Sequence, residues 1–375
     1  MKLKLIAAST AIALASPSLM AMELYKDDKK SLELGGYFGA NYVVADETDE
    51  VSNGSSRINF NFTHQMQDGW TAFAKAEWAV SLVSNNSDIV LGGDSTLAEG
   101  EASDTLSNRL GFVGAQHEKW GSVTVGKQWG SIYNVIGVTD NLHVFGGDAA
   151  GAYALGDGGY TGTGRAEQAI QYNNNFGNLS VSVQMQGTEE TVNIADFNPD
   201  FDATLDLIYD NSYGMSLTYA LPMNLSVGVG YNEASVEFTG FDSAITEEVN
   251  DTLTAVSVTY GAYGEQGLYA AVVAVEGEYH EFDNNGNMIE ESTGVEAMVS
   301  YRFANDLELI GAYNAVSSED AGNDYEKSYM VAGVAYYFSD TFRVYSEYKL
   351  DDSTNADGSE VEDDDVIAVG ARFSF

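Results

Sequence analysis

The sequence predicts an all-β protein: a transmembrane, antiparallel, 16-stranded β-barrel with a long third loop folded into its lumen. Apolar and polar residues alternate along nearly the whole chain, as in residues 57–63 (RINFNFT), and a period of two indicates strands with one apolar and one polar face. The alternation stops only over a long stretch, residues 130–164, which carries apolar side chains such as Ile132, Val135 and Phe145. A connection of this length is usually functional or disordered. Because these apolar side chains need burial, we expect the stretch to fold into the barrel.

The first 21 residues have the layout of a secretory signal peptide. Lys2 and Lys4 precede an apolar run at residues 5–15, and small residues lead to Ala21. A basic start, an apolar segment and a small residue at the cleavage site are typical of an exported precursor. The apolar run is too short to span a membrane. We therefore expect residues 1–21 to be the signal peptide and residues 22–375 to form one barrel domain.

Composition excludes several classes of function. The chain has 57 acidic and 16 basic residues and a formal net charge of −41, which excludes nucleic acid as a partner. Its 23 Tyr, 17 Phe and 39 Gly favour packed strands over disorder. It has no cysteine, and therefore no disulfide or thiol chemistry. Its 4 His have no ligand or triad spacing, which predicts that the chain is not an enzyme, since a hydrolase needs a histidine with a Ser or Asp partner.

Sixteen alternating segments can be placed along the chain. They are residues 31–43, 56–67, 70–83, 106–118, 121–129, 165–174, 179–187, 213–221, 225–236, 251–260, 267–281, 294–303, 307–316, 327–338, 342–349 and 365–375. The eighth is the least defined, because residues 204–209 could replace or extend it. Short turns alternate with long connections, and aromatic residues crowd the strand ends, as at Tyr336, Tyr337 and Phe338. Both features favour a membrane barrel with an aromatic girdle over a soluble sandwich, and an even number near sixteen leaves an aqueous lumen.

Acidic residues concentrate in the long connections, for example in residues 84–105 and 350–365. Most of them are expected to form a solvated rim. Because clustered carboxylates suit hard cations, a minority could hold divalent cations weakly. No EF-hand spacing is present, so we predict no cofactor and no defined metal site.

Several short motifs are shared with a known family. RINF and RLGF open at Arg57 and Arg109, GKQWG contains Lys127, and TDNL and FGGD occupy residues 139–142 and 145–148 of the long loop. With ELY at residues 23–25 and the terminal Phe375, they make the chain resemble the trimeric general porins of Gram-negative outer membranes over its mature length. The resemblance implies an outer-membrane channel for passive diffusion of small hydrophilic solutes and ions, and we expect it to prefer cations. It also implies a homotrimer in contact with outer-membrane lipid and lipopolysaccharide.

The resemblance further implies which residues form the pore constriction. The acidic side is Asp140, with Asp148 and Glu77 close to the contact between loop and wall. The basic side is Arg57, Arg109 and Arg165. The alternation agrees for Arg57, whose apolar neighbours face lipid. It also agrees for Arg109, which is opposite in phase to Leu110 and Phe112. The same alternation places Lys75 on the lumen face with Glu77.

Three positions depart from the family pattern. Val144 stands where a second constriction acid is common, His143 where the motif usually has proline, and Tyr37 where a lysine often completes the basic cluster. We therefore expect the constriction to have one acidic and one basic residue fewer than the family pattern, and a weaker transverse electric field. His143 is expected to be a loop histidine that hydrogen-bonds to backbone rather than a pH sensor.

Two further residues have expected roles outside the pore. Lys127 falls in the outward phase, and because a charge facing lipid is costly, we expect it to contact a neighbouring subunit, with acids of residues 84–105 as partners. Snorkelling at the strand end is the alternative. The resemblance implies that Phe375 is the assembly signal.

A second interpretation is a substrate-selective porin, for instance for oligosaccharides. Such a pore needs an aromatic track through the lumen. Tyr37, Trp129, Tyr133 and Tyr153 could supply one, although aromatic residues at strand ends more often belong to the girdle.

Overall fold

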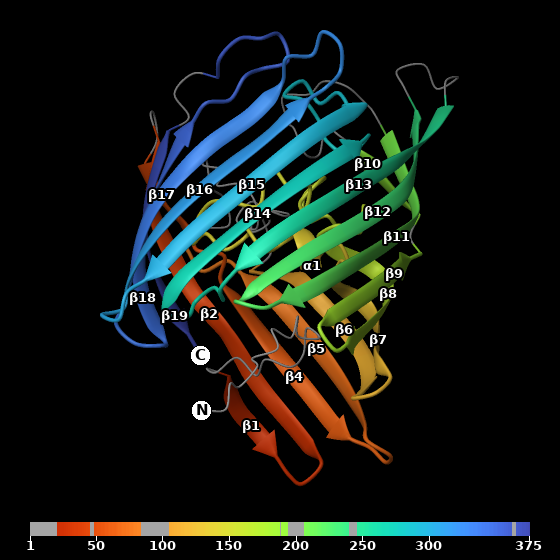
Figure 1. The fold of residues 1–375 in the computed structure, drawn as a ribbon, viewed down its shortest axis with the longest axis vertical. Coiled ribbons are helices and arrows are strands. Elements are labelled where there is room, and N and C mark those ends of the chain that lie inside the picture. Colours follow the sequence, from red (N-terminus) through yellow and green to blue (C-terminus); the bar gives the residue numbers. More distant parts are fainter. Residues whose placement is uncertain are drawn as a thin grey trace.

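The computed structural model describes residues 21–45, 49–83, 105–187, 189–193, 206–239, 246–361 and 365–375, which form a closed antiparallel barrel (Figure 1). The sixteen strands of its wall are β2 (Lys30–Val44), β4 (Arg57–Gln65), β5 (Trp70–Val80), β6 (Leu106–His117), β7 (Gly121–Trp129), β8 (Arg165–Phe176), β9 (Leu179–Gln186), β11 (Asp206–Leu221), β12 (Leu225–Thr239), β13 (Thr246–Tyr260), β14 (Gly267–Glu278), β15 (Glu291–Arg302), β16 (Leu307–Ser318), β17 (Glu326–Tyr337), β18 (Phe342–Asp351) and β19 (Val366–Ser374). Each pairs with its neighbours, and β19 pairs with β2 to close the ring. The predicted 16-stranded barrel is confirmed.

Three short strands extend this wall. β3 (Asp49–Asn53) pairs with the second half of β2, whose first half pairs with β4. β10 (Glu190–Asn193) pairs with the first residues of β11, and β9 pairs with its later part. Because β11 contains residues 206–209 and continues to Leu221, the poorly defined eighth segment is extended rather than replaced.

The first and last described strands lie on one edge of β2. β1 (Met22–Lys26) pairs with the start of β2, and β19 pairs with the remainder of the same edge. The last residue, Phe375, exchanges backbone hydrogen bonds with Gly36 at 3.0 Å, and its ring lies 5.0 Å from that of Phe38. Phe375 is therefore a paired residue of the ladder. Its predicted part in assembly stays a prediction.

The barrel is apolar outside and polar inside. Exposed side chains on neighbouring strands include Val227, Val229, Val256, Val258, Val272, Val295 and Val299, whereas buried ones facing inward include Gln184, Asn232, Ser257, Asn314 and Glu347. Exposed aromatic residues gather at the short-turn end, namely Tyr301, Phe303, Tyr336, Phe338, Phe342 and Phe373. An apolar outer face, a polar inner face and a girdle of aromatic residues are typical of a barrel that crosses a membrane. Among the described residues, no helix is long and apolar enough to cross a membrane.

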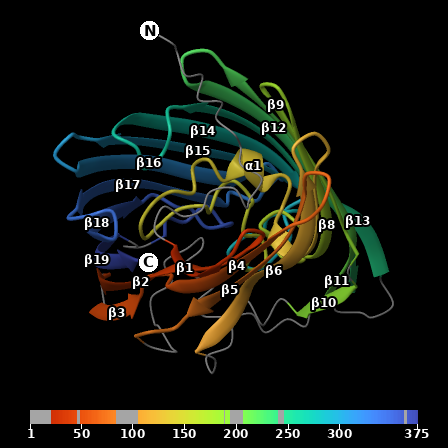
Figure 2. The same ribbon diagram turned by 90° about the horizontal axis from the view of Figure 1, so that it is seen from below.

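Residues 130–164 run inside the ring of strands, as predicted (Figure 2). Their short helix α1 (Tyr133–Ile136) contacts β11, β12 and β13. Ile132, Val135 and Ile136 are buried in an apolar cluster with wall residues such as Leu253 and Val273. Farther along, Val144 and Phe145 join a second cluster on β17 and β18. The apolar side chains that prompted the prediction are thus what holds the loop against the wall.

Glycines in the wall let the loop come this close. A Cβ at Gly230 would lie 2.8 Å from Cγ1 of Ile132, and a Cβ at Gly294 would overlap the carbonyl oxygen of Ala149. Neither position requires a left-handed backbone, so the reason for glycine is the loop's approach alone.

We expect Gly294→Ala to push the loop off the wall. Overpacking of this kind costs about 1–3 kcal/mol of stability, which stepwise heating before electrophoresis would register as an earlier loss of the folded barrel. Gly311→Ala is the matched control, because its Cβ would face outward and lie 3.5 Å from Val299. Equal midpoints for the two variants would contradict the proposed contact.

Candidate functional site in the lumen

A cavity of about 240 Å³ lies between the inner loop and the barrel wall. The loop contributes Tyr133, Tyr153 and residues 140–146, and the wall contributes Tyr37, Ser55, Arg57, Trp129, Tyr263, Arg343 and Arg372. Of the six predicted constriction residues, Arg57 and Asp140 line this cavity together. The other four lie elsewhere along the contact between loop and wall.

Asp140 is held in place by two tyrosines of its own loop. The hydroxyls of Tyr133 and Tyr153 donate to its Oδ2 at 2.7 and 2.5 Å. The ring of Tyr133 stacks on Trp129, with centroids 4.0 Å apart and planes 17° from parallel. The carboxylate therefore has a fixed position beside an aromatic pair. These tyrosines and Trp129 face the lumen, not the girdle.

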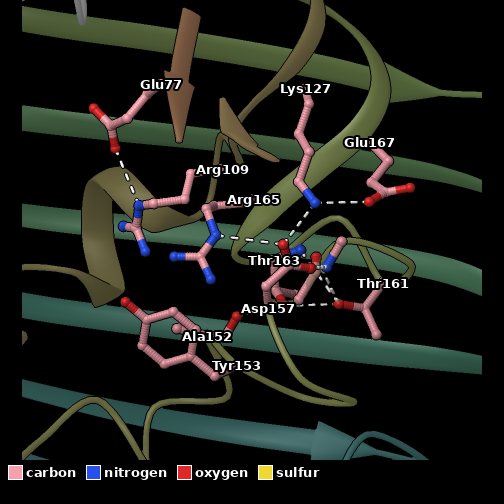
Figure 3. Close-up of polar contacts among 12 residues, drawn as sticks. Glu77, Arg109, Lys127, Ala152, Tyr153, Asp157, Thr161, Thr163, Arg165 and Glu167 are labelled. Atoms are coloured by element: carbon pink, nitrogen blue, oxygen red, sulfur yellow. Dashed lines mark hydrogen bonds and ion pairs between the residues drawn. The ribbon is translucent and has the colours of Figure 1, made fainter. Parts of the chain in front are cut away.

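Glu77 and Arg109 form an ion pair within the wall (Figure 3). Nε of Arg109 lies 3.1 Å from Oε1 of Glu77, and Nζ of Lys75 lies 3.2 Å from Oε2. Both members of the pair are buried. Lys75 and Glu77 thus share a face, as the alternation predicted.

The prediction that Leu110 and Phe112 point away from the lumen is wrong. The register of β5 and β6 shifts beside Glu77, so that Leu110, not Arg109, stands opposite Glu77. Leu110 and Phe112 are buried in an apolar cluster with Phe73. A bulge carries one extra residue, and here it brings Arg109 inward without sending its neighbour outward.

Arg165 and Lys127 share one carboxylate (Figure 3). Oδ2 of Asp157 lies 3.3 Å from Nε of Arg165 and 2.7 Å from Nζ of Lys127. Nζ of Lys127 is also 2.7 Å from Oε1 of Glu167. Lys127 thus has two partners within its own chain. Its predicted partners at residues 84–104 lie outside the described residues, so the subunit contact stays a prediction.

Asp148 contacts the wall at β17. Its Oδ2 lies 3.2 Å from Nζ of Lys327 and accepts a hydrogen bond from the hydroxyl of Tyr329, both on β17. Gly146 and Gly147, with φ of 116° and 77°, turn the chain just before it, and such angles favour glycine. Asp148 thus lies at the contact between loop and wall, where it was expected, although spacing along the loop did not reveal that this contact is with β17.

Two buried glutamates that the sequence analysis did not name hold the loop backbone. Glu347 accepts from the backbone N–H groups of His143, Val144 and Phe145 at 2.7, 2.9 and 3.3 Å. Glu296 accepts from those of Ala149 and Ala150 at 2.9 Å and from the hydroxyl of Thr139. The alternation puts both carboxylates on the inner face, but it cannot show which loop amides meet them.

Two arginines of the cavity were also missed. The guanidinium carbon of Arg372 lies 4.1 Å from the ring centre of Tyr37, and that of Arg57 lies 4.7 Å from it. Tyr37 is therefore within cation–π distance of two guanidinium groups, which suits the negative charge of its ring face. Arg343 also lines the cavity. The wall of the cavity therefore carries more basic residues than we expected from finding Tyr37 in place of the family's lysine.

His143 is buried beneath the loop. Its ring stacks on Tyr345 at 4.7 Å, and its Nε2 has no hydrogen-bond partner among the described residues. Burial lowers the pKa of His143 to about 4, although Glu308 opposes that shift. The ring is neutral at physiological pH. It is packed by stacking rather than by the backbone hydrogen bond that was predicted.

His280 links the far part of the loop to the wall. Its Nδ1 lies 2.6 Å from Oδ1 of Asp251, and its Nε2 donates to the carbonyl of Gly151 at 2.8 Å. Burial alone would lower the pKa of His280, but the attraction of Asp251 outweighs it and raises the pKa to about 9. His280 is therefore a cation at neutral pH. No group of three potential metal ligands occurs among the residues described.

We expect Glu347→Gln to loosen the loop. An amide has one acceptor oxygen and presents N–H groups to the loop's own donors, and an unsatisfied buried donor costs about 1–3 kcal/mol. Thermal unfolding in detergent should show a lower midpoint for this variant than for Glu118→Gln, whose side chain is exposed in a turn. Indistinguishable midpoints would count against the anchoring role.

We expect the His280 link to weaken in alkali. Its folded pKa of about 9 exceeds the ordinary 6.5, so its contribution is fully present below pH 6.5 and is lost as pH rises through 9. The shift corresponds to about 3 kcal/mol at most. The stability difference between wild type and His280→Gln should shrink between pH 7 and 10; a constant difference would refute this.

Comparison with known proteins agrees with this architecture. Residues 8–356 match the family model of the Gram-negative porins. Outer membrane protein S2 of Salmonella typhi is 27% identical and the porin OmpD of Citrobacter koseri 26% identical, each with 100% of both chains covered.

Two solved structures share the fold. That of Salmonella typhi OmpF in complex with daunomycin has a TM-score of 0.72 at 22% identity, covering 94% of this chain and 100% of its own. An anion-selective porin from Comamonas acidovorans has a TM-score of 0.68 at 16% identity, covering 92% and 100%. The chain belongs to the Gram-negative porins, the channel-forming β-barrels of the outer membrane.

Proposed function

We propose that this protein is a passive diffusion channel for small hydrophilic solutes and ions, with residues 130–164 forming its constriction. The observation that carries the proposal is the attachment of the loop to the inner wall. Glu296, Glu347 and His280 hold it at three places along its length. A loop attached in this way narrows the lumen permanently instead of moving as a lid, and leaves the path beside Arg57 and Asp140.

We further propose that the channel prefers cations. The constriction carries charges of both signs, and its basic wall does not favour cations. The chain as a whole has a net charge of −41, and many of its acids lie in the long connections at the pore mouth. Negative vestibules enrich cations within a Debye length. The fold does not determine whether a porin prefers cations or anions, since the Comamonas acidovorans porin of similar fold is named anion-selective.

The two sources of charge differ in their dependence on salt. The Debye length is ~10 Å at 0.1 M and ~3 Å at 1 M salt, so the vestibule should dominate at low salt and the constriction at high salt. We expect clear cation selectivity at low salt that weakens at 1 M. Asp140→Asn should act mainly at high salt. The exposed rim set Asp352→Asn, Asp357→Asn and Glu360→Gln should act only at low salt.

Reversal potentials across a salt gradient measure both effects in one purified sample. Anion preference at low salt, or selectivity that does not change with ionic strength, would overturn the proposal that the channel prefers cations. Absence of stepwise conductance would overturn the channel itself.

We propose a homotrimer surrounded by outer-membrane lipid and lipopolysaccharide. Support comes from a protein of the same fold, OmpT, an outer membrane protein of Vibrio cholerae, one structure of which is described as a trimer form. Unheated electrophoresis that shows only monomer would oppose this. Divalent cations bound weakly at the acidic connections remain a prediction.

A substrate-selective pore is the second candidate. Tyr37, Trp129, Tyr133 and Tyr153 all line the cavity, which supports an aromatic surface of the kind that such a pore needs. Blockade of the current by sugars would favour this candidate over a non-specific channel.

A further inference from the structure

Arg343 and Arg372 stand directly opposite each other on β18 and β19. Side chains paired in this way have Cβ atoms about 4.5–5.5 Å apart, and like charges so placed repel. Both residues line the lumen cavity, and Arg57 lines it from β4. Asp140 is the only carboxylate among the lining residues. The cavity therefore has an excess of positive charge, although the protein as a whole is strongly acidic.

The opposed arginines have no carboxylate in ion-pair contact among the described residues, although Arg372 attracts the charge of Glu347 over a longer distance. No ion pair of the described residues joins Arg343 or Arg372 to a carboxylate, and the buried Nε of each has no hydrogen-bond partner among those residues. Arg372 donates one hydrogen bond from Nη2, to the carbonyl of His143 at 3.1 Å. Guanidinium groups left with donors in a lined cavity suit a carboxylate, which accepts two parallel hydrogen bonds.

The nearest acids have other partners. Glu347 accepts the three loop amides described above, and Glu308 accepts the hydroxyl of Tyr337 at 2.8 Å. Neither lines the cavity. By contrast, Arg302 in the same end of the barrel has a carboxylate partner, because it donates to Asp306 at 2.9 Å and to the carbonyl of Gly264 at 3.0 Å. Its Nε, like those of Arg343 and Arg372, has no partner among the described residues. What distinguishes Arg343 and Arg372 from Arg302 is thus the lack of an ion-paired carboxylate among the described residues.

The rest of the cavity suits a hydroxylated ring. The stacked pair of Trp129 and Tyr133 offers an aromatic surface, and rings bind against such surfaces. Asp140 and Asn141 line the same space and carry acceptor and donor groups for hydroxyls. A volume of about 240 Å³ has room for one small ring but not for a long chain.

We propose that this cavity binds a sugar acid of the size of one hexuronic acid, with its carboxylate on Arg343 and Arg372 and its ring against Trp129. The proposal rests on the pore function given above, since the solute reaches the cavity through the lumen. It names a class of solute that the pore retains during passage. The acidic mouth and this basic cavity act at different steps: the mouth enriches small cations, and the arginines hold a solute that makes several contacts.

Calorimetric titration of the detergent-purified protein with D-galacturonate tests the proposal. The wild type should bind D-galacturonate, with D-galactose and acetate each bound at least tenfold more weakly. Arg343→Gln and Arg372→Gln should each weaken D-galacturonate binding at least tenfold, whereas Arg302→Gln should change it less than twofold. Trp129→Phe, which leaves both arginines in place, should weaken binding several-fold and provides a second variant if an arginine substitution prevents folding.

Any one of three results would overturn the assignment. These are no binding to the wild type, unchanged affinity in both arginine variants, or equal affinity for acetate or D-galactose. Conductance recorded from the same preparation separates this inference from the pore function. Normal channels without D-galacturonate binding would refute the inference alone, whereas absent conductance would refute the pore.

Discussion

The structure depends on satisfying the backbone of an irregular segment inside a barrel. The loop at residues 130–164 lacks the ladder that pairs the amides of a strand, and buried amides need partners. The wall provides these partners as buried carboxylates: Glu347 takes three consecutive loop amides and Glu296 takes two more. Removing the carboxylates would leave buried donors unpaired, so the position of the loop and the inner face of β15 and β18 depend on each other.

Charge and packing cooperate in this attachment. Carboxylates are costly to bury unless they are hydrogen-bonded, and the loop amides supply those bonds. The apolar clusters around Ile136 and Phe145 exclude water beside them. The hydrogen bond from His280, which Asp251 keeps charged, to the loop carbonyl of Gly151 adds a third attachment. Together they give the cavity a defined shape, which both the constriction and the solute site require.

Much of the fold follows from the alternation alone. A period of two placed the strands, gave Arg57, Lys75 and Glu77 a common lumen face, and left residues 130–164 as the one long exception. It failed at Leu110, because a bulge adds a residue without any change in the pattern. The ends of the strands were also misjudged near residues 204–212, where β11 begins earlier than its apolar residues suggested.

The site was less predictable than the fold. The family resemblance selected Arg57 and Asp140, which share the cavity. It also selected Asp148, which meets the wall at β17 and does not line that cavity. Arg343, Arg372 and Glu347 were visible as polar residues in phase with the lumen. Their importance comes from being opposite one another or opposite the loop, which depends on register across strands far apart in the sequence and not on any local pattern.

The central claim is that the fixed loop sets the path through the pore. It can be tested most directly with Asn141→Cys, because Asn141 lines the cavity and the chain has no other cysteine. Single-channel conductance would be recorded before and after a water-soluble charged thiol reagent is added. The account predicts a discrete fall in conductance, with selectivity shifted according to the sign of the reagent. Conductance and selectivity that stay unchanged after complete labelling would show that the loop does not border the path, and would contradict the account.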